Sequence, residues 1–338
     1  MKTHHVLTMK ILIGILLLNA PLILQSQQKL RVLATASMWF DMAQAIGGEL
    51  ISVDLIVPVG SDPHMYEATP SDVTKVIQTD VILMNGMTFE GWLGKLIENS
   101  GTKAKIYQIT EGIIPITNPE HNNAMDPHAW MDASNGLIYV GNILKSLIEN
   151  DPIHEKEYRF NYGIYKKELE DLHKYVQEKI LLIPKHRRIL ITSHDAFHYF
   201  GKKYDIQLES LLGTSTDADV QSADLIRINQ LIKTRNIPAI FIESTVNPKL
   251  IQQLQIENRI EIGGSLYADS LGDELSPAST YIKMLKHNAD IISSALSKDP
   301  TNNKTVLGKL NKGRWVYIGL AIFYCSLFIA LILINRKS

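Results

Sequence analysis

Short apolar runs rich in β-branched residues alternate with longer amphipathic stretches over most of this chain. Four such runs begin at residues 30, 51, 81 and 104, and three more begin at residues 188, 238 and 261. This alternation is typical of βαβ units, whose strands form a mainly parallel sheet. Because 338 residues exceed what one typical core organises, we expect two α/β lobes, at residues 29–150 and 185–296.

One long helix is expected between the lobes, at residues 151–184. Asp151 fits the N-cap and Pro152 the first helical position, while Pro184 marks the stop. Apolar side chains recur at helical spacing and leave a charged, solvated face opposite them: Tyr158, Tyr162, Tyr165, Leu169, Leu172, Val176 and Ile180. About 30 residues at about 1.5 Å each make a rod of about 45 Å. We expect this rigid helix to run along both lobes as a backbone.

Both ends of the chain carry apolar segments. Residues 1–28 have a basic start, a short apolar stretch and a polar break, which is typical of a signal peptide or, if uncleaved, an N-terminal anchor. Residues 315–334 contain no charged residue and predict a transmembrane helix, with the polar stretch 297–314 as a tether before it. We therefore expect the lobes outside the cytoplasm, in a periplasm or at the cell surface, and anchored to a membrane.

Charge and cysteine content argue against nucleic-acid binding and against a disulfide or thiolate metal site. The 34 Lys and Arg residues nearly balance 35 Asp and Glu residues, so no sustained basic field is available for a nucleic acid. The one cysteine, Cys325, lies inside the apolar segment near the C-terminus, so neither an internal disulfide nor a thiolate cluster can form. A metal site in this chain must therefore use nitrogen and oxygen ligands.

Three histidines and one aspartate each end or follow a predicted strand, where open α/β sheets place their ligands. These residues are His64, His128, His194 and Asp269. His64 and His128 both come directly after an Asp-Pro pair, whose proline restricts the backbone and lowers the entropy lost in holding an imidazole. Imidazole nitrogens with a carboxylate suit zinc, manganese or ferrous iron. The sequence predicts that these four residues form one metal site.

Further motifs accompany these positions, at residues 85–93 (NGMTFEGWL), 192–206 (TSHDAFHYFGKKYDI), 242–249 (IESTVNPK) and 266–272 (LYADSLG). With them the chain resembles the cluster A-I, or cluster 9, solute-binding proteins of ABC importers for zinc, manganese and iron. The resemblance implies two lobes joined by a rigid helix, with a divalent metal clasped between them and delivered to a membrane permease. It places His64 and His128 in the first lobe and His194 and Asp269 in the second.

The chain departs from the pattern of this family at three points. Family members often carry a lipid-modified cysteine at the mature N-terminus, and here the helix at 315–334 is expected to replace it as the anchor. Many manganese-preferring relatives have glutamate where this chain has His194, and zinc-specific relatives have a long His-rich loop where this chain has only His121. We interpret His121 as a solvated loop residue, with metal shuttling as the alternative. The metal stays open among zinc, manganese and iron.

Two other functions compete with transport. A metal-dependent hydrolase also uses histidines and an aspartate, but a catalytic metal keeps one position open for water, and four protein ligands would close a tetrahedral shell. A surface adhesin would need a binding surface, and the sequence contains no repeat or extended patch that favours one. We therefore expect a monomeric metal carrier that is not an enzyme.

Overall fold

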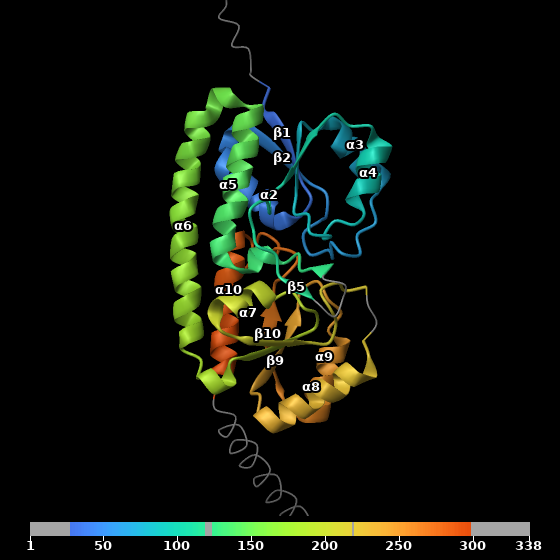
Figure 1. Ribbon diagram of the computed structural model, residues 1–338, viewed down its shortest axis with the longest axis vertical. Helices are drawn as coiled ribbons and strands as arrows, with labels where there is room; N and C mark the ends of the chain where they lie inside the picture. Colours follow the sequence, from blue (N-terminus) through green and yellow to red (C-terminus); the bar gives the residue numbers. More distant parts are fainter. Residues whose placement is uncertain (1–27, 119–123, 218–219, 299–338) are drawn as a thin grey trace, which may run out of the picture.

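The computed structural model describes residues 28–118, 124–217 and 220–298. The expected span 315–334, nearly all of the expected N-terminal segment 1–28, most of the tether and His121 lie outside these ranges. Within the described ranges, no helix is both long enough and apolar enough to cross a membrane. The described residues form two α/β lobes alongside one long helix, as expected (Figure 1).

The N-terminal lobe contains a four-stranded parallel sheet in the order β2-β1-β3-β4. Val32 at the centre of the sheet pairs with Val53 on one side and Val81 on the other. These β-branched side chains fit a sheet that helices cover on both faces. In chain order the elements are β1 (Leu30–Ala34), α2 (Ser37–Gly47), β2 (Ile51–Leu55), α3 (Pro70–Gln78), β3 (Val81–Met84), α4 (Leu93–Ser100) and β4 (Lys105–Gln108).

The C-terminal lobe contains two parallel strand pairs, β7 with β8 and β9 with β10, and β7 lies against β9. Helices alternate with the strands, and the predicted apolar runs correspond to β7, β9 and β10, whereas the strand β8 was not predicted. The elements are β7 (Ile189–Thr192), α7 (His198–Tyr204), β8 (Gln207–Ser210), α8 (Ser222–Arg235), β9 (Ala239–Glu243), α9 (Lys249–Asn258), β10 (Glu261–Leu266) and α10 (Tyr281–Leu296).

Between the lobes, α5 (Ala133–Asn150) leads into the long helix α6 (Glu155–Leu181). The α-helix begins later than the sequence predicts, because Pro152–His154 form a 3-10 turn. Asp151 explains this turn. Its carboxylate accepts a hydrogen bond from the Tyr158 hydroxyl (2.6 Å) and contacts His154 Nδ1 (2.6 Å), so it does not cap the backbone amides at the start of the helix. The predicted apolar stripe faces the core, with Tyr162 only half-buried.

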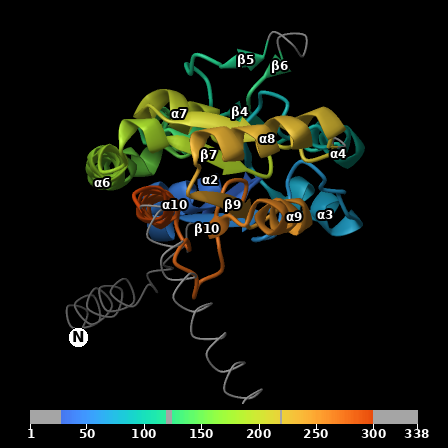
Figure 2. The same ribbon diagram turned by 90° about the horizontal axis from the view of Figure 1, so that it is seen from below.

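One hydrophobic core runs through both lobes. It includes Trp39 of α2, Leu169 of α6, Phe200 of α7 and Phe241 of β9, all of which are fully buried. Smaller clusters fill the other face of each sheet. Seen from below, α6 and α10 lie together at one side of the molecule, with α3 and α4 at the opposite side (Figure 2). The long helix therefore packs on a core that both lobes share.

Buried hydrogen bonds also join the lobes. The Trp130 indole N–H donates to the carbonyl of Ala268 (2.9 Å), and the Tyr281 hydroxyl donates to the carbonyl of Trp130 (2.6 Å). The Leu271 N–H donates to the Ser37 hydroxyl oxygen (2.9 Å). These contacts connect the start of α10 and the loop after β10 to the N-terminal lobe. In the loop after β2, the Gly60 N–H donates to the Ser270 hydroxyl (2.7 Å), so the loops that follow β2 and β10 also meet.

Candidate metal centre

The two histidines of the N-terminal lobe share one local structure, built by their Asp-Pro-His sequences. The backbone N–H of His64 donates to Asp62 Oδ1 (2.9 Å), and that of His128 donates to Asp126 Oδ1 (2.9 Å). An aspartate that accepts the N–H two residues on forms a tight turn and limits the backbone conformations available to the histidine. Each imidazole is therefore held near a fixed point before any ligand binds.

The C-terminal lobe supplies the other two predicted residues from the ends of its strands. His194 lies two residues after β7, and its backbone N–H donates to Glu243 Oε1 at the end of β9 (2.9 Å). Asp269 lies three residues after β10. Because the strands are parallel, their carboxyl ends lie at the same edge of the lobe and bring these loops together.

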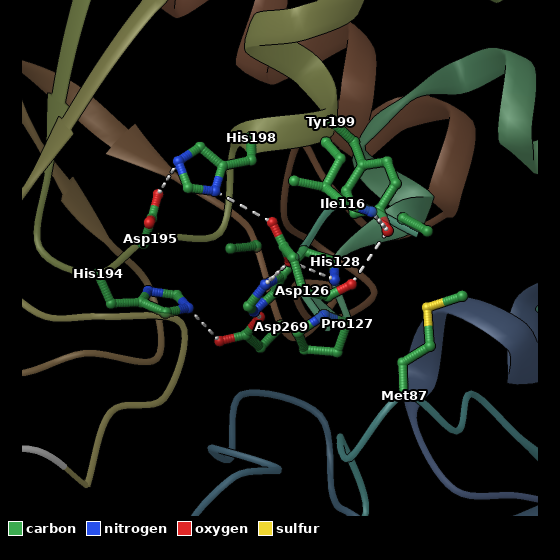
Figure 3. A network of polar contacts seen from close by, with 12 residues as sticks. Met87, Ile116, Asp126, Pro127, His128, His194, Asp195, His198, Tyr199 and Asp269 are labelled. Atoms are coloured by element: carbon green, nitrogen blue, oxygen red, sulfur yellow. Dashed lines mark hydrogen bonds and ion pairs between the residues drawn. The ribbon is translucent and has the colours of Figure 1, made fainter. Parts of the chain in front are cut away.

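The structure brings all four predicted residues together. Figure 3 shows three of them, His128, His194 and Asp269. His64 Nε2 and His128 Nε2 are 3.3 Å apart, His128 Nε2 is 3.3 Å from Asp269 Oδ1, and His194 Nε2 is 3.1 Å from Asp269 Oδ2. One ligand atom from each residue lies within 4.8 Å of all the others. His128, His194 and Asp269 are fully buried, while the His64 side chain keeps 6% of its surface exposed.

Aromatic rings enclose the two histidines of the N-terminal lobe. The centroid of the Phe89 ring is 5.0 Å from that of His64, and the centroid of Trp130 is 5.3 Å from that of His128. Phe89 and Trp130 also contact each other edge to face. Both rings are buried and keep water from that side of the histidines, which strengthens electrostatic interactions within the cluster.

Two buried carboxylates lie behind the histidines and were not predicted from the sequence. Asp126 Oδ1 is 2.8 Å from His128 Nδ1, and Glu243 Oε2 is 2.6 Å from His194 Nδ1, at an angle that departs from a regular hydrogen bond. Carboxylates at Nδ1 fix the imidazole orientation and leave Nε2 free to bind a metal. A signal for Glu243 was present, because it ends the predicted strand at 238–244 in the same way as the chosen residues end theirs.

The carboxylates outweigh burial in setting the charge of two histidines. Burial by itself lowers the pKa of His128, but Asp126 and Asp269 raise it to about 9. Burial also opposes protonation of His194, and the charges of Glu243 and Asp269 nonetheless raise its pKa well above the usual value. The neighbouring carboxylates therefore favour positive charge at His128 and His194.

The other two members of the cluster differ in which effect dominates. Burial lowers the pKa of His64 to about 4, so this imidazole is neutral at pH 7. Burial raises the pKa of Asp269, but His194 and His128 hold that pKa well below its usual value. A neutral imidazole and an ionised carboxylate are the forms that bind a metal ion.

Comparison with known proteins shows the family of the chain. Residues 32–295 match the family described as the periplasmic component A of a zinc-uptake complex, ZnuA. The chain belongs to this family. Among curated relatives, the manganese-binding lipoprotein MntA of Halalkalibacterium halodurans is 33% identical over 271 residues, covering 80% of this chain and 89% of the relative. The iron ABC transporter substrate-binding lipoprotein MtsA of Streptococcus pyogenes is 34% identical over 278 residues, covering 80% and 90%.

Solved structures of similar proteins agree with the fold. The periplasmic zinc-binding protein TroA of Treponema pallidum superposes with a TM-score of 0.77 at 31% identity, covering 80% of this chain and all of that one. The manganese-bound periplasmic protein of Candidatus Liberibacter asiaticus gives a TM-score of 0.73 at 29% identity, covering 79% and 100%. The predicted two-lobed α/β fold and the predicted family of metal-binding components of ABC importers, which are not enzymes, are confirmed.

Proposed function

We propose that this chain binds a divalent transition metal, zinc, manganese or ferrous iron, through His64, His128, His194 and Asp269 and delivers it as a monomer to the permease of an ABC importer. The observation that carries the proposal is the convergence of four ligand atoms within 4.8 Å, two from each lobe. Three nitrogens and one oxygen suit these borderline metals. The relatives named for manganese, iron and zinc support the same range of metals.

The arrangement favours carriage over catalysis. Four protein ligands complete a tetrahedral shell and leave no open position for a substrate or a reactive water. The site is also closed, since three of the four side chains are fully buried. A metal held by both lobes leaves when one lobe's ligands move away, which fits a carrier that must release its cargo to a permease.

The site is tested by removing the ligands of one lobe. The double variant His194→Ala/Asp269→Ala should stay folded and bind zinc far more weakly than wild type, because half of the coordination shell is lost. His186→Ala removes an exposed histidine outside the site and serves as the matched control. Elemental analysis of protein purified without chelator, followed by competition among zinc, manganese and iron, identifies the metal. Wild-type affinity in the double variant would reject the site.

We further propose that the protein acts outside the cytoplasm and is held there by the apolar segment 315–334. The two curated relatives described above are named lipoproteins, whereas the one cysteine of this chain, Cys325, lies inside that segment. Arg187 donates to the carbonyls of Ser297 and Lys298, so a chain ending at Lys298 keeps the contacts of the folded lobes. That fragment should bind metal and stay soluble after the membrane is washed with carbonate. A fragment still bound to the membrane would show that residues 1–28 form the anchor.

A further inference from the structure

We propose that His198 is a positioning residue for the metal site, which acts from the C-terminal lobe on the ligand His128 through Asp126. The inference rests on the proposed function and adds a residue to it. His198 lies within the motif at residues 192–206, but it does not end a strand as the four predicted residues do. It is outside the group of four and begins helix α7.

The Asp126 carboxylate divides its two oxygens between the two histidines (Figure 3). Oδ1 accepts from the backbone N–H of His128 (2.9 Å) and lies 2.8 Å from its Nδ1. Oδ2 lies 3.3 Å from Nδ1 of His198, at ion-pair distance and at an angle that departs from a regular hydrogen bond. Asp126 is 3% exposed, so its orientation is set by protein groups. The side chain that orients His128 is thus itself held by a residue of the opposite lobe.

The other nitrogen of His198 is also engaged. Nε2 lies 3.2 Å from Asp195 Oδ1, and the backbone N–H of Asp195 donates to the carbonyl of Gly213 (3.1 Å). The imidazole therefore lies between one carboxylate from each lobe, and Asp195 directly follows the ligand His194. Both contacts are at ion-pair distance and place the His198 ring between Asp126 and Asp195.

The next residue strengthens the same link through the backbone. The Tyr199 hydroxyl donates to the carbonyl of Asp126 (3.1 Å) and accepts from the backbone N–H of Ile116 (3.0 Å). The start of α7 thus holds Asp126 by both its side chain and its carbonyl.

Solvent can reach His198 although it cannot reach the metal ligands of the C-terminal lobe. His198 and Asp126 line a cavity of about 440 Å³ together with Lys202 and Leu208, and the His198 side chain is 36% exposed. Truncating His198 would admit water to Asp126 Oδ2 and let the carboxylate turn away from His128. Separation of the lobes would also remove His198 from Asp126 and free the carboxylate to turn. Binding of the metal by His128 should therefore weaken as the lobes separate.

The test measures zinc affinity of the full-length chain by competition with a chromophoric chelator. His198→Ala should raise the dissociation constant about 3–10-fold, less than the roughly 10–100-fold typical of a direct partner of a metal ligand, because His198 acts at one remove. His198→Asn should restore most of the affinity, since its amide nitrogen reaches the place of Nδ1. His186→Ala, the exposed control used above, should leave the affinity within about twofold of wild type.

A double-variant cycle separates positioning from simple packing. In an Asp126→Ala background, His198→Ala should have no further effect on zinc affinity, because the group through which it acts is gone. The absorption spectrum of bound Co²⁺, which reports ligand geometry, should change in His198→Ala and return in His198→Asn. Thermal unfolding confirms that each variant is folded.

Two outcomes overturn the inference in different ways. Wild-type zinc affinity in His198→Ala, or effects of the two substitutions that add independently, would reject His198 as a positioning residue while the proposed function stands. Absence of zinc, manganese and iron binding by the wild-type chain would reject the proposed function, and the inference with it.

Discussion

Replacing Glu243 with glutamine should weaken metal binding while the protein stays folded. Glu243 is buried and contacts His194 twice, at the backbone N–H (2.9 Å) and at Nδ1 (2.6 Å). When Nε2 of His194 is free to bind the metal, the backbone N–H and the protonated Nδ1 are both hydrogen-bond donors toward Glu243. A glutamine amide offers one acceptor and one donor, so one of the two contacts becomes repulsive or forces the imidazole proton onto Nε2, where the metal must bind.

The size of the effect follows from what is lost. A hydrogen bond to a charged group contributes about 1.5–3 kcal/mol, and a neutral one about 0.5–1.5 kcal/mol. Losing the charge at Glu243 and disturbing one contact should therefore cost about 1.5–3 kcal/mol of metal-binding free energy, which corresponds to about 10–150-fold in the dissociation constant. Outer partners of metal ligands give losses of about 10–100-fold, which agrees with this range.

Competition with a chromophoric chelator at pH 8 measures this difference directly. Glu257→Gln on the exposed face of α9 is the matched control and should bind as wild type. Thermal unfolding of the metal-free variants checks that the fold is intact. If Glu243→Gln binds zinc as tightly as wild type while folded, the carboxylate does not orient His194, and the argument from the two contacts is wrong.

Three further predictions concern protons and stability. The pKa of about 9 at His128 means that bound protons must leave when a metal enters, so the apparent metal affinity should rise with pH from about 5 to 9. Calorimetry in buffers of different ionisation enthalpy should count more than one proton released per metal at pH 7. An affinity that does not change with pH would contradict this. Leu169→Ala in the buried stripe of α6 should lower the free energy of unfolding by about 2–5 kcal/mol, whereas Ile164→Ala on its exposed face should change it by less than about 0.5 kcal/mol; equal losses in chemical denaturation would refute the orientation of α6. Tyr281→Phe, which leaves the buried Trp130 carbonyl without its donor, should cost about 1–3 kcal/mol, and an unchanged melting temperature would argue against this link between the lobes.

The fold was predictable because its signals are local and repeated. Each predicted strand is a short β-branched run, and each covering helix has its own apolar stripe, so errors in one element do not spread to the next. The first residue of α6 was not predictable, because the Asp151 carboxylate can bond either the helix amides or the side chains of His154 and Tyr158. Only the three-dimensional structure shows that it bonds the side chains.

The sequence predicted the four residues of the candidate site, but not the contacts that hold them in place. His64, His128, His194 and Asp269 could be selected because strand ends and Asp-Pro turns are visible in one dimension, and the structure brings them together. Their role as ligands stays a prediction. The contact of Asp126 with His198 joins positions 72 residues apart on different lobes, and it depends on how the lobes pack, which no local pattern records.

The core shared by the two lobes has a consequence for how the protein folds as it is made. Synthesis delivers the N-terminal sheet first, yet that sheet is packed through α2, α5 and α6 onto a cluster that Tyr281, Leu285 and Ile292 of α10 complete. The backbone N–H of Tyr281 also donates to Asp41 of α2 (2.9 Å). Residues 29–150 therefore cannot reach their final packing until residue 296 has left the ribosome. Until then, apolar surface of the N-terminal lobe stays exposed. The last helix of the described chain closes both lobes at once.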